Sequence, residues 1–263
     1  MFQVEDRFLL YIDILGFKEL ISNDAEIEIL YEAIDQLNVH SDLDFHTIVF
    51  SDTILVAADV KWNSAPEQVV MWLIEFSQDL FYRLSHRNIH FRAMITKGKF
   101  YHGRLRNFEA YHGKALVDCY LKEGNIKCCG TFLDNRLVQY SDVFFTSKFD
   151  NDVSFVHLMQ HLDDVSFPFV QYPISGEDLM ATGMEYWVAY LIRYLSIVYK
   201  NANDTSLPSE VRAKYLMTWE MIAKRHDGLL RRLVLSNFIA SDVIQMDWSE
   251  AEMRIGTDDG AWG

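Results

Sequence analysis

The chain of 263 residues has little of what keeps a polypeptide unfolded or carries it into a membrane. Four prolines and 12 glycines argue against long linkers and disorder. No apolar run reaches the roughly 20 residues that a membrane-spanning helix needs. The N-terminal residues include Glu5, Asp6 and Arg7 where a secretory signal would have a basic segment followed by an apolar one. We therefore expect a folded, cytoplasmic protein that does not enter a membrane.

Cysteine and basic residues are also scarce. Cys119, Cys128 and Cys129 do not make a disulfide framework, and no histidine or further cysteine stands at zinc-ligand spacing beside them. We expect three reduced thiols. The 24 basic residues face 38 acidic ones, which gives a formal charge of −14, and no basic tract occurs. This balance argues against nucleic acid or an anionic membrane as the main partner.

Apolar residues, by contrast, are abundant, and their periodicity predicts an α+β fold. An apolar strand is followed by a helix, two strands at hairpin spacing, a second helix and another strand, which is the order of a ferredoxin-like palm. Lys97-Gly98-Lys99 is expected to form a turn or bend, with residues 99–102 extended beyond it. The predicted strands cover residues 8–14, 45–50, 53–59 and 89–96, with a further one from 131, and the predicted helices cover 25–38, 66–85 and 113–123.

The pattern changes near residue 150, where helical periodicity takes over. Long amphipathic helices are predicted over 177–201 and 208–235. We expect one domain over residues 1–150 and a mainly helical extension over 151–263 packed on it, ending in a frayed tail over 256–263. An apolar and aromatic stripe on the first long helix predicts core packing, with an interface to a second subunit as the alternative: Met184, Trp187, Val188, Leu191, Tyr194, Leu195 and Val198.

Two acidic residues stand where a buried strand ends and where a hairpin turns. Asp13 ends the apolar run that begins at Phe8, and Asp52 lies in the turn between the two hairpin strands. A carboxylate at the end of a buried strand is costly unless a cation meets it. If the strands are neighbours, the two carboxylates form a pocket for Mg²⁺ or Mn²⁺. The alternative is local: Asp13 caps the following helix and Asp52 supplies turn chemistry.

Four motifs around these residues resemble those of class III nucleotidyl cyclases. They are Asp13-Ile14-Leu15-Gly16-Phe17, Ser51-Asp52, the strand from Arg92 to Gly98, and the helix that runs from Gly113 to Glu123. The motifs occur in the family's order over about residues 8–125. No Walker loop, Gly-x-Gly-x-x-Gly or Gly-x-Ser-x-Gly motif offers a competing chemistry.

This resemblance implies a site and a mechanism. Asp13, Asp52 and the Ile14 carbonyl would bind two divalent ions, and the amides of Leu15, Gly16 and Phe17 would hold the β- and γ-phosphates. The metals would activate the ribose 3′-hydroxyl and neutralise the departing pyrophosphate. Because class III sites lie between two catalytic domains, the resemblance also implies a head-to-tail homodimer.

The departures from the family pattern bear on the substrate. The base-selecting lysine of purine cyclases is replaced by Ile48 and the acidic base contact by Ala110, so neither ATP nor GTP is expected. The transition-state Asn and Arg are replaced by Val117 and Leu121. Four basic residues are candidates for the missing cation, with solubilising surface charge as the alternative: Arg104, Arg106, Lys114 and Lys122.

A metal pair without purine contacts resembles the stand-alone pyrimidine cyclases of bacterial Pycsar anti-phage systems. That resemblance implies conversion of UTP or CTP, with UTP slightly preferred, to the 3′,5′-cyclic monophosphate, which a separate effector protein then binds. Two alternatives remain: a cyclase-like nucleotide sensor without turnover, and an ordinary purine cyclase.

Overall fold

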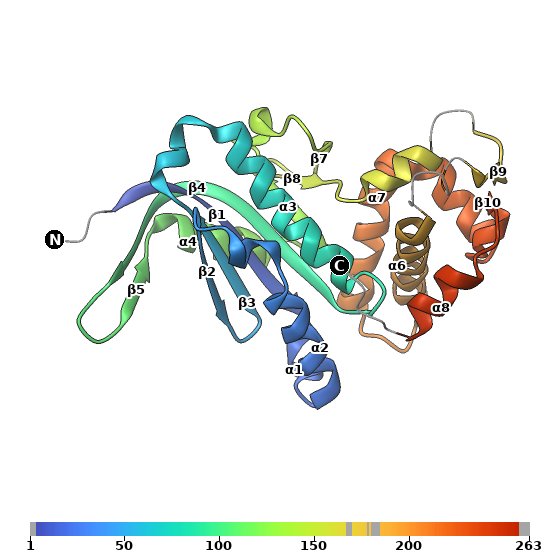
Figure 1. Cartoon of the computed structure of the whole chain (residues 1–263), viewed down its shortest axis with the longest axis horizontal. Helices are drawn as coiled ribbons and strands as arrows, with labels where there is room; N and C mark the ends of the chain where they lie inside the picture. The colour runs from blue at the N-terminus through green and yellow to red at the C-terminus, as the bar shows by residue number, and fades with distance from the viewer. Residues whose placement is uncertain (1–3, 167–169, 178, 180–184, 258–263) are drawn as a thin grey trace. The chain divides into compact units, whose positions relative to one another are not determined.

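The computed structural model describes residues 4–166, 170–177, 179 and 185–257 (Figure 1). Its contacts divide the chain into two compact units, which are described separately below. The division into domains at residue 150 stays a prediction. The first unit comprises Met1–Phe81 and His90–Leu158, and the second comprises Tyr82–Ile89 and Met159–Gly263.

The centre of the first unit is an antiparallel sheet with strand order β2-β3-β1-β4. The elements follow one another along the chain as a strand, helices, a hairpin, a helix and a strand. This order and the strand order of the sheet confirm the predicted α+β, ferredoxin-like palm. The predicted hairpin and both flanking helical regions are present. The bounds are β1 (Glu5–Leu15), α1 (Phe17–Leu20), α2 (Asp24–Asp35), β2 (Phe45–Phe50), β3 (Thr53–Ala58), α3 (Pro66–Leu84) and β4 (His90–Arg104).

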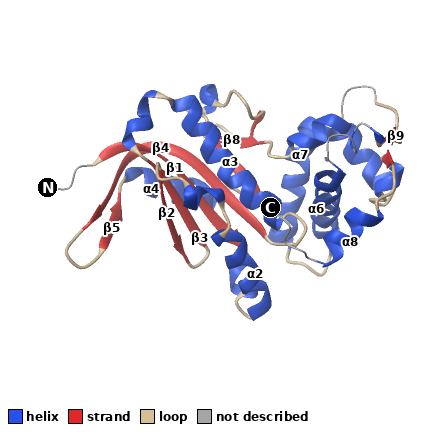
Figure 2. Cartoon of the chain, viewed as in Figure 1, coloured by secondary structure: helices blue, strands red, loops and turns tan. Residues whose placement is uncertain are grey.

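Further strands extend the sheet beyond β4. β6 (Gly130–Asp134) pairs with β4 in parallel, as expected when a helix, α4 (Lys114–Asn125), connects the two strands. The outer strands β8 (Val153–Val156) and β7 (Thr146–Lys148) follow in that order, and β5 (Glu109–His112) forms a hairpin with the far end of β4. The helices α3 and α4 cover opposite faces of the sheet (Figure 2).

β4 differs from the sequence prediction. The bend expected at Lys97-Gly98-Lys99 is absent, because Gly98 pairs with Arg7 and β4 stays paired with β1 as far as Phe100. A Cβ on Gly98 would lie 3.4 Å from the Ala115 side chain of α4. The glycine therefore allows a helix to approach the strand closely, which is a common role of glycine within strands. The prediction of a turn was wrong.

The second unit is mainly helical. α6 (Glu185–Asn203) packs against α7 (Ser209–Leu235), which begins directly after Pro208 and contains a kink at His226. Both helices confirm predicted ones, although residues 178 and 180–184 of the first predicted range lie outside the described residues. The other elements are β9 (Ile174–Ser175), β10 (Ile244–Gln245), α8 (Ser249–Thr257) and the short 3₁₀ helices η1 (Asn38–Ser41), η2 (Val60–Ser64), η3 (Val138–Tyr140), η4 (Gln160–Val165) and η5 (Ala240–Asp242).

Core packing explains most of the apolar stripe on α6. Five of its members are buried: Val188, Leu191, Tyr194, Leu195 and Val198. Trp187 stacks on His161 with ring centroids 5.5 Å apart, and Met184 lies outside the described residues. Of the predicted tail, Gly256 and Thr257 belong to α8 instead, and residues 258–263 lie outside the described residues.

Gly113 supplies a test of how α4 is attached to the sheet. Its φ is 153°, and a Cβ there would clash with the Lys99 carbonyl oxygen. We expect Gly113→Ala to lower the free energy of unfolding by about 2 kcal/mol or more. Gly124→Ala, inside α4 with nothing within 4 Å of the added Cβ, is the matched control and should be neutral or stabilising by up to about 1 kcal/mol. Urea unfolding measures both; equal effects would show that Gly113 is not constrained.

Candidate functional site

Strand pairing brings Asp13 and Asp52 together. Asp13 lies opposite Thr53, the first residue of β3, and Asp52 directly precedes that residue. The Ile14 amide donates a 2.8 Å hydrogen bond to the Asp52 carbonyl oxygen. Ser51, the other turn residue, has a φ of 56°. The two candidate metal ligands therefore lie side by side, Asp13 on β1 and Asp52 in the β2–β3 turn.

Arg92 of β4 is the cation next to this carboxylate pair. It lies opposite Asp13 in the sheet, and its guanidinium approaches the Asp13 Oδ2 to 3.4 Å. The same guanidinium contacts the Glu123 carboxylate of α4 and donates a 2.6 Å hydrogen bond to the Ile126 carbonyl oxygen. One arginine thus joins β1, β4 and α4, and it contacts two carboxylates, those of Asp13 and Glu123.

The electrostatics of the site favour the addition of positive charge. Burial raises the pKa of Asp13, and the Asp52 charge raises that pKa further, against the opposing effect of Arg92. Burial likewise raises the pKa of Glu123 to about 6, with Asp13 acting in the same direction and Arg92 opposing. A single guanidinium therefore does not neutralise the cluster.

The candidate phosphate-binding residues follow Asp13 directly. Leu15 is the last residue of β1, Gly16 has a φ of 73°, and Phe17 begins the four-residue α1. The Gly16 carbonyl oxygen accepts hydrogen bonds from the amides of Glu19 and Leu20, at 3.0 and 3.1 Å. The positive φ suits glycine and turns the chain sharply beside the carboxylates. The role of these amides in phosphate binding stays a prediction.

The two candidate base contacts do not meet. Ile48 lies in β2 on the same face of the sheet as Asp13, since it is paired through Leu55 to Tyr11 and side chains two residues apart share a face. Ala110 lies in β5 opposite Gly103. Its neighbour Tyr111 stacks on His102, so the alternation of side chains turns Ala110 to the other face of the hairpin.

The replacements for the family's transition-state residues are exposed. Val117 and Leu121, together with Tyr120, form an apolar strip along α4 with exposed fractions of 54%, 57% and 62%. Arg106 and Lys114 are exposed as well, on the β4–β5 loop and at the start of α4. None of these positions supplies a cation next to Asp13 within the described part of the chain.

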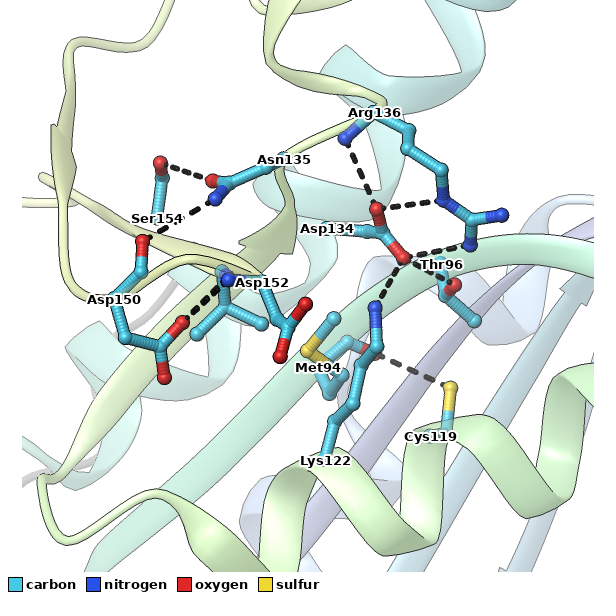
Figure 3. A network of polar contacts seen from close by, with 11 residues as sticks. Met94, Thr96, Cys119, Lys122, Asp134, Asn135, Arg136, Asp150, Asp152 and Ser154 are labelled. Atoms are coloured by element: carbon cyan, nitrogen blue, oxygen red, sulfur yellow. Dashed lines mark hydrogen bonds and ion pairs between the residues drawn. The ribbon is translucent and has the colours of Figure 1, made fainter.

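Lys122 and Arg104 already have acidic partners. The Lys122 Nζ lies 2.5 Å from Oδ2 of the buried Asp134, which also binds Arg136 and Thr96 (Figure 3). Arg104 lies 3.6 Å from Glu109. Asp134 of β6 lies next to Thr96 of β4, four residues along that strand from Arg92. Because Lys122 is bound to Asp134, it is held at Thr96 and not at the carboxylates beside Arg92.

Sequence reasoning missed Arg92 and Glu123 as site residues. Arg92 is the one Lys, Arg, Asp or Glu in the strand predicted over 89–96, and a charge in such a strand needs a partner. Glu123 is one of two adjacent charged residues near the end of α4. The signal was present, but the partner of each is distant in sequence: Arg92 and Asp13 are 79 residues apart.

The donor set fits a divalent cation that keeps part of its hydration. No group of three or more His, Cys, Asp or Glu side chains able to hold a metal ion occurs among the described residues. Asp13 and Asp52 provide carboxylate oxygens, and the Ile14 carbonyl is the predicted third contact. Mg²⁺ is commonly bound by one or two carboxylates, with water and substrate phosphates completing the shell. The under-neutralised pair therefore suits such an ion.

Comparisons with known proteins identify similar folds only. No protein-family model matches the chain, and no curated protein does. Solved structures of similar fold include the adenylyl cyclase CyaB from P. aeruginosa, with 12% identity, 60% of this chain and 96% of that one covered, and a TM-score of 0.45. A bacterial light-regulated adenylyl cyclase has 11% identity, 59% and 92% coverage and a TM-score of 0.45. The guanylyl cyclase Cya2 has 14% identity, 59% and 92% coverage and a TM-score of 0.39.

Cys119, Cys128 and Cys129 are all buried, and none of the three belongs to a disulfide. No described helix has both the length and the apolar character needed to cross a membrane.

Proposed function

We propose that this protein is a pyrimidine nucleotide cyclase, converting UTP or CTP to the 3′,5′-cyclic monophosphate and pyrophosphate. The observation that supports the proposal best is the Asp13–Asp52 pair, placed by β1 and the β2–β3 turn of a ferredoxin-like sheet with too little positive charge beside it. A structural helix cap or turn residue needs no such partner carboxylate. Paired, under-neutralised carboxylates are what metal-dependent phosphoryl chemistry requires.

Two Mg²⁺ or Mn²⁺ ions held by Asp13, Asp52 and the Ile14 carbonyl would supply the charge that activates the ribose 3′-hydroxyl and stabilises pyrophosphate. The chain itself positions the reactants. Arg92 fixes the Asp13 carboxylate through an ion pair and ties it to α4. The junction from Leu15 to Phe17 places backbone amides beside the carboxylates, where they would orient the β- and γ-phosphates.

The preference for a pyrimidine is supported by the two base positions. Ile48 has neither charge nor hydrogen-bonding side-chain atoms, and Ala110 is turned away from it. A purine base would therefore lack both of the polar contacts that purine cyclases provide. The proposed active form is a head-to-tail homodimer in the cytoplasm, whose product is bound by a separate effector in anti-phage defence.

Incubation of the purified protein with each of the four NTPs and Mn²⁺, followed by mass spectrometry, tests the proposal. We expect cyclic UMP or cyclic CMP as the main product, together with pyrophosphate. Cyclic AMP or cyclic GMP as the main product would contradict the base preference. Omission of the metal and addition of a chelator are the controls, and both should abolish product formation.

A second function, nucleotide sensing without turnover, is favoured by Val117 and Leu121. These apolar side chains cannot stabilise the charge that develops on a transferring phosphoryl group. If the sensor is correct, the protein binds a nucleoside triphosphate with metal but forms no cyclic product from any of the four. Calorimetric binding alongside the mass-spectrometric assay separates the two functions.

A further inference from the structure

A polar cluster lies beside the two positions at which purine contacts are missing. It consists of Glu109 and Tyr111 on β5, His102 and Arg104 on β4, and His46 on β2. The His102 ring stacks on Tyr111 with centroids 4.6 Å apart and 5° between the planes, and it meets His46 at 4.5 Å. His46 is two residues from Ile48 on the same strand, and thus on the same face of the sheet as Ile48 and Asp13.

Glu109 is at the centre of this cluster, with donors on both sides. Its Oε1 lies 3.6 Å from the Arg104 guanidinium, and its Oε2 lies 3.6 Å from the His102 Nε2. The Tyr111 hydroxyl donates a short hydrogen bond to the same Oε2. That hydrogen bond, aided by His102 and Arg104, lowers the pKa of Glu109. An ionised carboxylate accepts hydrogen bonds only. Arg104, Glu109 and His102 therefore present a donor, an acceptor and a donor, in that order.

We propose that Arg104, Glu109 and His102 bind the Watson–Crick edge of uracil and make UTP the preferred substrate; this inference rests on the proposed function. Uracil presents the complementary order: the O4 acceptor, the N3–H donor and the O2 acceptor. N3–H would donate to Glu109, while Arg104 and His102 donate to the two carbonyl oxygens. In a head-to-tail dimer, this cluster serves the nucleotide whose phosphates lie at the partner's carboxylates.

Each of the other bases would place an acceptor against an acceptor, or a donor against a donor, of this cluster. Cytosine would place its N3 acceptor, and adenine its N1 acceptor, against the Glu109 carboxylate. Guanine matches at N1–H but places its 2-amino donor against a donor of the protein. Sites built on hydrogen bonds discriminate strongly because a mismatched base leaves such groups unpaired. The cluster therefore gives a direct reason to select uracil. Ile48 and Ala110, by contrast, explain only why a purine would lack its contacts.

Two conservative variants test the inference. Glu109→Gln makes the acceptor an amide that both donates and accepts, and Arg104→Gln removes a guanidinium whose side chain is 82% exposed, so neither should disturb folding. We expect each to reduce the preference for UTP over CTP at least tenfold, measured as the ratio of dissociation constants with Mg²⁺ and as the ratio of kcat/KM. His112→Ala is the matched control, because His112 stacks on Tyr101 at 4.9 Å and follows Tyr111 on the opposite face of the same hairpin. The His112→Ala variant should keep the wild-type preference for UTP over CTP.

The possible outcomes separate the inference from the proposed function. A wild-type protein that prefers CTP, or variants that bind UTP with unchanged preference, would overturn the uracil assignment while leaving pyrimidine cyclisation intact. A wild-type protein that binds UTP preferentially without converting it would remove the proposed catalysis, and the ratio of dissociation constants would still decide the role of the cluster. A wild-type protein that binds neither pyrimidine nucleotide would overturn both.

Discussion

Asp13→Asn and Asp52→Asn should each reduce the turnover of a pyrimidine nucleoside triphosphate by about three orders of magnitude or more. Asparagine keeps the shape of the side chain but loses the charge that holds a divalent ion. Without the ion, neither activation of the ribose hydroxyl nor neutralisation of pyrophosphate is supplied. Initial rates at saturating metal and nucleotide, for both variants and the wild type, measure the effect.

The fold should survive these substitutions. Asp13 has a side chain that is 23% exposed, and Arg92 keeps its contacts with Glu123 and the Ile126 carbonyl in the Asp13→Asn variant. We expect the free energy of unfolding to change by less than about 1 kcal/mol. Asp6→Asn is the matched control: Asp6 lies on the same strand, is 50% exposed and pairs with Lys99 at 2.9 Å.

Comparison of these variants then shows whether the carboxylate pair serves catalysis, nucleotide binding or the fold. Full activity in Asp13→Asn would show that the carboxylate pair is structural and would leave the proposed mechanism without its metal site. If the wild type has no turnover, the same variants should weaken metal-dependent nucleotide binding, as the sensor requires. Loss of activity in Asp6→Asn to the same degree would point to a general effect of surface charge.

The sequence predicted the sheet and the carboxylate pair for a common reason: both depend on local signals. Apolar strands, the two-residue turn at Ser51-Asp52 and the helix beginning at Pro66 are each encoded within a short segment. Their order along the chain then leaves few topologies open. The proximity of Asp13 to Asp52 follows from strand pairing, so no long-range contact had to be guessed.

The features that were missed depend on contacts between distant segments. Gly98 was taken for a turn because the approach of Ala115 is invisible in the local sequence. Arg92 and Glu123 join the site only when α4 folds across β1 and β4. The face on which Ala110 lies was not predictable either, because the β4–β5 hairpin was not recognised and its pairing decides which side chains alternate outward.

The largest effect on stability is expected in the network of ion pairs around Asp134. Its side chain is 2% exposed, and it accepts hydrogen bonds from Lys122 at 2.5 Å, from Arg136 at 2.7 and 2.9 Å, and from Thr96 at 3.2 Å. Burial alone would raise the pKa of Asp134, but the hydrogen bonds from Arg136 and Lys122 hold it well below its ordinary value. The carboxylate is thus buried, ionised and dependent on two cations.

The cations of this network are more exposed than the carboxylate. This difference determines how much stability is lost when the cations or the carboxylate are replaced. The side chain of Arg136 is 67% exposed and that of Lys122 is 25% exposed, so both can turn to water when Asp134 is replaced. Asp134 has no such alternative. The double variant Lys122→Met with Arg136→Met should therefore lower the free energy of unfolding by about 3–5 kcal/mol, because it leaves a buried charge without a cationic partner. Asp134→Leu alone should cost less.

Combining all three substitutions should restore at least half of the loss, since no buried charge remains and apolar groups fill the space. Urea unfolding of the four proteins, analysed as a double-mutant cycle, measures the coupling. Asp150→Ala is the control for a general effect of removing an aspartate, because Asp150 is exposed and accepts turn hydrogen bonds from the amides of Asp152 and Val153. It should cost about 1 kcal/mol.

Acidification supplies an independent check of the same network. Because the folded-state pKa of Asp134 lies below its unfolded value of about 4, the stabilisation is fully present above that pH and is lost as the pH falls below it. The wild type should therefore lose stability between about pH 4 and pH 2 more steeply than the triple variant, which has no such group. Parallel pH profiles for the two proteins, or a triple variant less stable than the double one, would mean that the ionised carboxylate does not hold α4 and β6 together.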